Sequence, residues 1–431
     1  MKGKVALHNL GCKVNAYETE AMQQMLEAAG YEIVPFEPGA DIYVINTCTV
    51  TNIADRKSRQ MLHKAKKMNP DAIVVAAGCY VQADTKKAEA DASIDIIIGN
   101  NKKQELISIL ENYRSGQQKT TECVDINHTK EYENLHLTKQ GEHTRAYIKV
   151  QDGCNQFCSY CIIPYARGRV RSRAKEDVVA EVTDLAKNGY QEVVLTGIHL
   201  SSYGIDFENE DNLLSLIRAV HKIEGIKRIR LGSLEPRIIT EEFVQAIAAL
   251  PKMCPHFHLS LQSGCNETLK RMNRRYTSEE FYEKCEILRK YFEKPALTTD
   301  VIVGFPQETE EEFETTYEFL KKICFYETHI FKYSKREGTK AAVMQGQIPE
   351  QIKAKRSARL IELGEKNRRA YEESFLGKTV EVLVEEKSDV NGKEMWTGHT
   401  KEYMKIALES EKNLQNCILN VQIKDGREII H

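Results

Sequence analysis

The sequence predicts an α/β protein with three parts: an N-terminal parallel sheet domain, a central partial (β/α)6 barrel and a small C-terminal antiparallel β-barrel. Short apolar runs alternate with amphipathic stretches over the first 115 residues, and the alternation restarts near residue 145 and repeats six times. After residue 376, apolar residues recur at every second position instead. A chain of 431 residues is long enough for about three domains of ordinary size.

The first domain is predicted over residues 1–115. We expect strands at 5–10, 42–45, 73–77 and 94–98, and helices at 16–29, 54–68 and 102–113. Strands that alternate with helices pair in parallel, and ligands of such sheets bind beyond the carboxyl ends of the strands. Residues 116–143 are mostly polar, so we interpret them as a connection between domains.

The barrel domain is predicted over residues 144–375. We expect strands at 146–150, 193–196, 229–231, 257–261, 299–303 and 329–333, and helices at 175–187, 213–222, 241–250, 278–291 and 310–323. A long charged helix at 349–375 follows the last strand. Barrels of this kind carry their chemistry at the carboxyl ends of the strands, so candidate residues are sought there.

The last domain is predicted over residues 376–431. Alternation within 380–384, 404–408 and 417–423 is typical of strands in a small antiparallel barrel. Asp and Glu outnumber Lys and Arg in this segment, so it does not form a general cationic clamp.

Composition restricts the class of protein. Sixty-one Lys and Arg against 63 Asp and Glu give a net charge of −2, so a nucleic acid would have to meet a local basic patch. No uncharged run reaches the roughly 18 apolar residues of a membrane helix, and the first residues do not resemble a secretory signal. We therefore expect a cytoplasmic protein with no membrane partner. In that reducing compartment, twelve cysteines point to metal binding or catalysis before disulfides.

Three of the cysteines follow the first expected barrel strand, in the sequence Gly-Cys-Asn-Gln-Phe-Cys-Ser-Tyr-Cys. On one tight loop, Cys154, Cys158 and Cys161 can bind three irons of a 4Fe–4S cluster and leave the fourth iron open. The alternative is a structural zinc loop. Such a site needs four ligands, and no His or Cys follows within the next dozen residues.

A second set of cysteines lies in the first domain. Cys12, Cys48 and Cys79 each follow an expected strand by a few residues. Because the carboxyl ends of parallel strands meet at one edge of a sheet, these thiols are predicted to converge on a second cluster with an open iron. The alternative is three separate buried thiols, since cysteine is among the most buried residue types.

The Cys-x3-Cys-x2-Cys spacing, with Tyr160 before the last cysteine, resembles the signature of the radical S-adenosylmethionine (SAM) superfamily. The resemblance implies that SAM chelates the open iron and that an electron from the cluster cleaves it to a 5′-deoxyadenosyl radical. The protein contributes placement and the exclusion of water. Candidates for the SAM pocket are Tyr160 and three residues that follow barrel strands, Gly197, Gln262 and Gly304.

Two cysteine sets followed by a small barrel resemble the methylthiotransferase family over nearly the whole chain. The motifs are Leu-Gly-Cys-Lys-Val-Asn at 10–15, Asn-Thr-Cys-Thr-Val-Thr at 46–51, Ala-Arg-Gly at 166–168, Leu-Thr-Gly-Ile-His at 195–199, Leu-Gln-Ser-Gly at 261–264 and Asp-Val-Ile-Val-Gly-Phe-Pro at 300–306. The family implies two SAM per turnover: one methylates a sulfur on the auxiliary cluster of Cys12, Cys48 and Cys79, and the other supplies the radical. It also implies an electron donor of flavodoxin or ferredoxin type and no general base.

Lys13 and Val14 make the sequence similar to the branch that adds the methylthio group to carbon 2 of N6-threonylcarbamoyladenosine, at position 37 of tRNA. Two alternatives share the chemistry: isopentenyladenosine in tRNA, or a ribosomal protein. A third is of another class, a non-catalytic zinc-stabilised RNA-binding protein.

Contacts with the tRNA anticodon loop are predicted in two places. Arg167, Arg169, Arg171 and Arg173 alternate after the cluster loop, giving a strip for phosphates, with a solvated edge as the alternative. The C-terminal domain resembles the RNA-binding TRAM domain of this family, where Lys401 and Tyr403 are the expected contacts. His256 and His258 share one face of an expected strand; we interpret them as hydrogen-bonded histidines, with a metal pair as the alternative.

Overall fold

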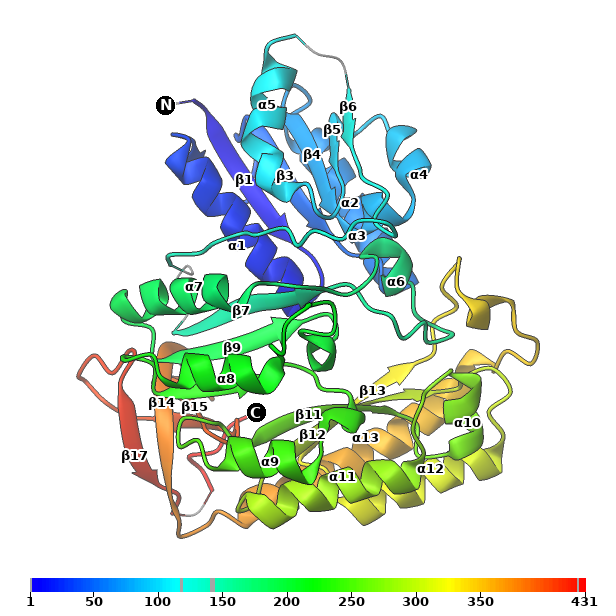
Figure 1. The fold of residues 1–431 in the computed structure, drawn as a ribbon, viewed down its shortest axis with the longest axis vertical. Helices are drawn as coiled ribbons and strands as arrows, with labels where there is room; N and C mark the ends of the chain where they lie inside the picture. The colour runs from blue at the N-terminus through cyan, green and yellow to red at the C-terminus, as the bar shows by residue number, and fades with distance from the viewer. Residues whose placement is uncertain (1, 117–118, 140–143, 425) are drawn as a thin grey trace.

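The computed structural model describes residues 2–116, 119–139, 144–424 and 426–431 (Figure 1). The N-terminal sheet lies at the top of this view, the barrel below it, and the C-terminal strands beside the barrel. Over the described ranges, no helix is both long enough and apolar enough to cross a membrane.

The N-terminal sheet has six parallel strands in the order β2-β1-β3-β4-β5-β6, which confirms the predicted parallel architecture. Its strands are β1 (Lys4–Asn9), β2 (Glu32–Ile33), β3 (Ile42–Thr47), β4 (Ile73–Gly78), β5 (Ile96–Ile98) and β6 (Thr120–Glu122). Apolar residues of α1 (Lys13–Ala28) and α5 (Leu106–Arg114) pack on one face. Those of α2 (Asn52–Met68), α3 (Cys79–Ala83) and α4 (Thr85–Glu89) pack on the other.

The segment interpreted as a connection takes part in this sheet. Thr120–Glu122 pair with β5, and Leu135 and Leu137 are buried against α1. The sequence did not reveal the strand because Thr-Thr-Glu has no apolar alternation and lies at a sheet edge. Residues 117–118 and 140–143 of this segment lie outside the described ranges, and the domain boundaries at 115, 143 and 375 stay predictions.

The barrel sheet has six parallel strands, as predicted. They are β7 (Arg145–Asp152), β9 (Glu192–Gly197), β10 (Arg228–Leu231), β11 (His256–Gln262), β12 (Ala296–Val303) and β13 (Glu327–Lys332). Pairing runs β10-β9-β7 and β11-β12-β13, and the short β8 (Arg171–Ser172) lies antiparallel to β7. Isolated parallel bridges link Ile229 of β10 to Met253, just before β11, and Leu234, just after β10, to Leu259 of β11. The helices are α6 (Ile163–Ala166), α7 (Lys175–Lys187), α8 (Leu213–His221), α9 (Glu241–Ala248), α10 (Asn266–Arg271), α11 (Ser278–Tyr291), α12 (Glu310–Ile323) and α13 (Glu350–Glu373).

The two faces of the barrel sheet differ in chemistry. Alternate residues such as Leu259, Leu261, Val301 and Val303 join one large apolar core with the surrounding helices. The residues between them point to the opposite side, which we call the inner face. That face carries polar and charged side chains: Arg145, Tyr147, Lys149, Glu192, Arg228, Arg230, His256, His258, Thr298, Asp300 and His329.

The C-terminal domain is a four-stranded antiparallel sheet in the order β16-β15-β14-β17. Its strands are β14 (Thr379–Val390), β15 (Lys393–Thr400), β16 (Lys405–Leu408) and β17 (Ile418–Gln422). β15 was not predicted from the sequence because few of its residues are apolar. The Asn391-Gly392 turn, with both φ angles positive, was the available signal for a hairpin.

Candidate active site

Cys12, Cys48 and Cys79 follow the neighbouring parallel strands β1, β3 and β4 at one edge of the N-terminal sheet. Their loops are tied together by Asn15, whose Nδ2 donates at 2.7 and 3.0 Å to the backbone carbonyls of Leu10 and Thr47. Both other thiols are close enough to act electrostatically on the thiol of Cys48. The three thiols therefore gather at one place, as the strand order led us to expect.

Cys154, Cys158 and Cys161 lie in the loop between β7 and α6. Their thiols also gather, because the first two act electrostatically on the third. The backbone N–H of Gln156 points at Cys154 Sγ at 3.5 Å, and Arg274 Nη1 donates to Cys158 Sγ at 3.2 Å. The loop thus presents three sulfur atoms, two of which accept hydrogen bonds.

We call Cys12, Cys48 and Cys79 the first trio and Cys154, Cys158 and Cys161 the second trio. In each trio a glycine precedes a cysteine because the backbone leaves no room for a side chain. Gly78 has φ +96°, and a Cβ there would lie 2.5 Å from Asn46 Oδ1. Gly153 has φ +73°, and a Cβ there would lie 1.8 Å from the carbonyl oxygen of Arg169. Any larger residue would move Cys79 or Cys154.

Burial raises the pKa of the Cys48 and Cys154 thiols to about 11 and that of Cys161 to about 12. These thiols stay protonated near neutral pH unless a cation is added to the site. A bound metal supplies that charge and converts the thiols to thiolates. All twelve cysteines are free, so no disulfide competes for them.

Arg167 is the main partner of the first trio. Its Nε donates to Cys79 Sγ at 3.2 Å, and Asn100 Nδ2 approaches the same sulfur at 3.6 Å. The other guanidinium nitrogens of Arg167 donate to Glu18 at 2.9 and 3.0 Å and to Asp152 at 3.0 Å. Lys103 and Lys149 also pair with these buried carboxylates.

The loops that carry the two trios are joined directly. Arg167 follows Cys161 on the same segment and contacts Cys79, and Asn100 Nδ2 donates to the carbonyl of Ala166 at 2.7 Å. From the loop after β13, Arg336 Nη2 donates to Thr49 Oγ1 at 2.6 Å, next to Cys48. The two trios therefore border a shared region between the N-terminal sheet and the barrel.

The predicted arginine strip is wrong for three of its four members. Arg167, Arg171 and Arg173 are 0–1% exposed. Arg171 Nη1 donates to the carbonyls of Arg167 and Arg169, and Arg173 pairs with Glu181. The partners that draw these side chains inward are the distant carboxylate of Glu18 for Arg167, carbonyls of the same loop for Arg171, and Glu181 of α7 for Arg173. Arg169 alone is exposed, with its guanidinium 4.4 Å from the ring centroid of Phe157.

The candidate SAM-pocket residues lie around the strand ends near the second trio. Gly197 ends β9, Gln262 ends β11 with φ +71°, and Gly304 follows β12. Tyr160 packs edge-on against Phe305, with the ring centroids 6.4 Å apart. Their assignment to a SAM pocket stays a prediction.

His199 was given no role from the sequence. His199 follows Gly197 at the end of β9, and its Nδ1 pairs with Ser202 Oγ at 2.7 Å, while its buried Nε2 has no hydrogen-bond partner among the described residues. Burial, with Arg274 and Arg237 nearby, lowers the pKa of His199 to about 4. The available signal was its position just beyond a barrel strand.

Lys13 reaches the inner face of the barrel sheet from the start of α1. Its Nζ lies 5.6 Å from the ring centroid of Tyr147, and burial together with the nearby Arg145 and Arg230 lowers its pKa. Among the residues that the structure describes, no carboxylate forms an ion pair with Lys13. The ammonium group is partly desolvated, but part of the residue remains exposed to solvent, so a ligand can reach this cation.

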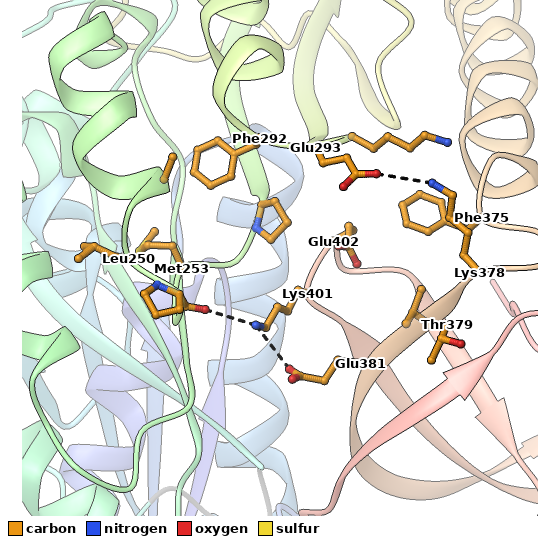
Figure 2. A pocket seen from close by; sticks show the side chains of 15 residues that line it. Leu250, Met253, Phe292, Glu293, Phe375, Lys378, Thr379, Glu381, Lys401 and Glu402 are labelled. Carbon is orange, nitrogen blue, oxygen red and sulfur yellow. Dashed lines mark hydrogen bonds and ion pairs between the residues drawn. The ribbon is translucent and has the colours of Figure 1, made fainter.

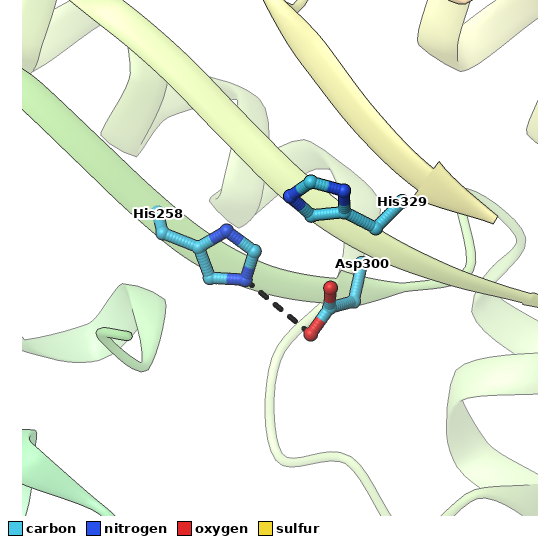
Figure 3. Close-up of side chains that lie close together, drawn as sticks. All are labelled: His258, Asp300 and His329. Carbon is cyan, nitrogen blue, oxygen red and sulfur yellow. Dashed lines mark ion pairs between the residues drawn. The ribbon is translucent and has the colours of Figure 1, made fainter. Parts of the chain in front are cut away.

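Further along the inner face, His258, Asp300 and His329 come from the adjacent strands β11, β12 and β13 (Figure 3). One ligand atom from each lies within 4.8 Å of the other two. The His258 and His329 rings are stacked with centroids 5.7 Å apart. His258 is thus a hydrogen-bonded histidine, as interpreted, but its neighbour in this group is His329, because His256 instead stacks on Tyr403.

Lys401 and Tyr403 lie near the amino ends of the barrel strands, away from the trios. Lys401 Nζ reaches the carbonyl of Pro251 at 3.3 Å and Glu381 at 3.8 Å, in a pocket of about 440 Å³ (Figure 2). The ring of Tyr403 is stacked by His256 at 5.0 Å and His399 at 4.5 Å. These histidines pack on the ring of Tyr403, and the RNA contacts of Lys401 and Tyr403 stay predictions.

Comparisons with known proteins identify the family. Residues 148–320 match the Radical SAM superfamily, and residues 4–99 match a family described as Uncharacterized protein family UPF0004. The chain is 42% identical to threonylcarbamoyladenosine tRNA methylthiotransferase MtaB of Bacillus subtilis (strain 168), over 97% of this chain and 93% of that one. The chain belongs to the radical SAM methylthiotransferase family.

This methylthiotransferase is also 35% identical to the tRNA-2-methylthio-N(6)-dimethylallyladenosine synthase of Acetivibrio thermocellus, over 97% of this chain and 88% of that one. Among solved structures, the radical SAM methyltransferase TsrM of Kitasatospora setae has a TM-score of 0.56 at 16% identity, covering 77% of this chain and 72% of that one. That likeness supports the fold.

Family membership makes the protein a transferase whose cofactors are 4Fe–4S clusters and SAM. The non-catalytic zinc-binding alternative is therefore set aside. Both cysteine trios fit a cluster by their chemistry, because each offers three free, gathered thiols and a guanidinium donor to one sulfur.

Proposed function

We propose that this methylthiotransferase adds a methylthio group to carbon 2 of N6-threonylcarbamoyladenosine in the anticodon loop of tRNA. The relative named for this substrate is 42% identical, against 35% for the relative named for dimethylallyladenosine. The observation that carries the choice is Lys13 on the inner face of the barrel sheet. A threonylcarbamoyl group bears a carboxylate, whereas a dimethylallyl group is apolar and uncharged.

Charge complementarity supports this choice. The cations near Lys13 already have carboxylate partners, since Arg145 pairs with Glu385 and Arg230 with Glu192. An apolar substituent beside Lys13 would displace water from the ammonium group without replacing the hydrogen bonds that the water made. A carboxylate would supply the missing partner, so the inner face favours the charged substituent.

In this proposal Cys12, Cys48 and Cys79 hold the auxiliary cluster, and Cys154, Cys158 and Cys161 hold the cluster that binds SAM. When bound, the clusters and two SAM per turnover supply the sulfur, the methyl group and the radical. Arg167 and Arg274 each donate to one ligand sulfur and stabilise its negative charge.

The remaining partners belong to the same proposal. A base in a single-stranded loop can leave its stack for about a few kcal/mol, which lets it enter the region between the trios. Arg169 is exposed beside this region and is the proposed phosphate contact. Electrons come from a donor of flavodoxin or ferredoxin type, and residues 376–431 serve as the TRAM-like RNA-binding domain.

The first experiment compares substrates directly. The reconstituted enzyme is given anticodon stem-loops that carry either threonylcarbamoyladenosine or isopentenyladenosine, and the nucleosides are analysed by mass spectrometry. We expect 2-methylthio product from the first stem-loop. Product from the second alone would overturn the assignment.

The second experiment tests the carboxylate argument. Lys13→Met is expected to lower kcat/KM for the threonylcarbamoyl stem-loop about 10- to 100-fold, the range that a charged hydrogen bond contributes. Lys86→Met, at an exposed lysine on α4, is the matched control. Iron content is measured alongside because Lys13 adjoins Cys12. An equal loss of SAM cleavage without tRNA would contradict the role in recognition.

A further inference from the structure

His258, Asp300 and His329 form a group separate from both cysteine trios. Each lies mid-strand: Gln262, at the end of β11, is four residues after His258, and Gly304, just past β12, is four residues after Asp300. Four residues of strand span about 13 Å, so the group sits well below the strand ends. It is open to solvent on the inner face, because the side chains of His258 and Asp300 are 17% and 31% exposed and His329 is exposed.

We propose that His258, Asp300 and His329 bind one divalent transition-metal ion, in addition to the iron–sulfur clusters. Two imidazoles and one carboxylate on one side of an ion form the facial arrangement that binds Fe(II) and related divalent metals, with the remaining positions open. Three adjacent strands supply one ligand each, so the backbone fixes their spacing. Asp300 and His329 are direct partners in the register of β12 and β13.

The side-chain geometry is close to that of a bound site. His258 Nε2 lies 3.3 Å from Asp300 Oδ2, and all three ligand atoms are within 4.8 Å of one another. Bonds of about 2.0–2.2 Å from one ion would bring the atoms to separations near 3 Å, which side-chain rotation alone can supply. Figure 3 shows the three side chains directed toward one another.

The surroundings of His258 fit a metal ligand. Its Nδ1 pairs with Thr298 Oγ1 at 3.0 Å, which leaves Nε2 directed at the carboxylate. Histidine ligands of metals usually donate their second ring N–H in this way, which fixes the tautomer. Thr298 is 2% exposed and comes from the neighbouring strand, so this orientation is rigid.

A simple ion pair between His258 and Asp300 would not account for His329. Within the described residues His329 has no hydrogen-bond or ion-pair partner, yet its ring stacks beside that of His258. The open coordination positions would face the inner side of the sheet and accept oxygen donors. If the proposed function holds, the oxygen atoms of the threonylcarbamoyl group are donors of this kind.

The test measures metal content without tRNA, so it does not depend on the substrate assignment. The anaerobic holoenzyme is dialysed against micromolar Mn(II) or Zn(II), and iron, sulfide, manganese and zinc are counted per chain. We expect one added ion per chain in the wild type, and its loss in His258→Ala and His329→Ala with iron and sulfide unchanged. His63→Ala removes a histidine from a plain His–Asp pair and should keep the added ion.

Two further measurements distinguish weakened metal coordination from misfolding of the variant. Thr298→Val keeps the side-chain shape and removes the hydrogen bond to His258, so the dissociation constant of Mn(II), followed by its EPR signal, should rise about 10- to 100-fold. His329→Ala changes an exposed residue and should leave the thermal unfolding midpoint within a few degrees. The proposal is overturned if the wild type takes up no added ion, or if the triad variants hold as much as His63→Ala.

Discussion

The two cysteine trios each lie beside an arginine, but the two arginines have different partners. Arg167, beside the first trio, is fully buried and pairs with the carboxylates of Glu18 and Asp152. Arg274, beside the second trio, donates to the carbonyl of Ser260 and to the hydroxyl of Tyr276. Its hydrogen-bond partners, apart from the cysteine sulfur, are neutral.

This difference shows how each trio depends on the rest of the molecule. Glu18 belongs to α1 of the N-terminal sheet domain and Asp152 to β7 of the barrel, so Arg167 is held by both parts. Arg274 is held by the barrel alone. The position of the Arg167 guanidinium beside the first trio therefore depends on the packing of the N-terminal sheet domain against the barrel. The position of the Arg274 guanidinium beside the second trio depends on barrel residues alone.

The largest expected effect separates the trios by activity. Cys158→Ala should abolish SAM cleavage, whereas Cys48→Ala should still cleave SAM to 5′-deoxyadenosine but form no methylthio product. Each variant should lose about four of about eight irons per chain. Product analysis by mass spectrometry, with iron and sulfide counts, checks both. Loss of SAM cleavage in both variants would contradict separate roles for the two trios in SAM cleavage and methylthio transfer.

The next effect concerns stability. Glu18→Gln leaves Arg167, Lys103 and Lys149 short of a buried negative charge, and removing one partner of such a group costs about 3–5 kcal/mol. Tyr276→Phe removes a neutral partner of Arg274 and should cost about 1–3 kcal/mol. Anaerobic denaturant unfolding measures both. Equal losses in the free energy of unfolding would contradict the distinction between Arg167, which has charged partners, and Arg274, which has neutral ones.

The sequence was sufficient for the positions of the trios but not for their surroundings. Cys12, Cys48 and Cys79 could be placed together because parallel strands bring their carboxyl ends to one edge. The orientation of Arg167 could not be predicted, because its carboxylate partner Glu18 is 149 residues away in the chain. The alternation within 167–173 predicted a strip of exposed arginines, and only the tertiary packing decided which of them reach solvent.

A third prediction follows from the pKa shifts of the carboxylates around Arg167. Burial alone would raise the pKa of Glu18, but Arg167, Lys103 and Lys149 outweigh it and hold the pKa well below its usual value. A carboxyl group with a depressed folded-state pKa stabilises the protein above its unfolded pKa of about 4 and loses that contribution as the pH falls below it.

The wild type should therefore lose stability more steeply than Glu18→Gln below about pH 4, while their difference stays constant between about pH 5 and 7. Anaerobic unfolding across this range measures the difference. A gap that is unchanged down to about pH 3 would indicate that Glu18 is not the titrating partner of Arg167.

The smallest expected effect concerns the segment that connects the trios, where Arg169 is exposed and Arg171 is buried. If Arg169 contacts a tRNA phosphate, Arg169→Ala should reduce the slope of log K against log salt by about 0.7–0.9. Its stability cost should stay near 0.5–1 kcal/mol, since the contact with Phe157 is at the surface. Arg171→Ala should instead destabilise the fold by about 1–3 kcal/mol, because it leaves the carbonyls of Arg167 and Arg169 without a donor. An unchanged salt slope for Arg169→Ala would leave this segment a structural link between the trios and move the phosphate contact elsewhere.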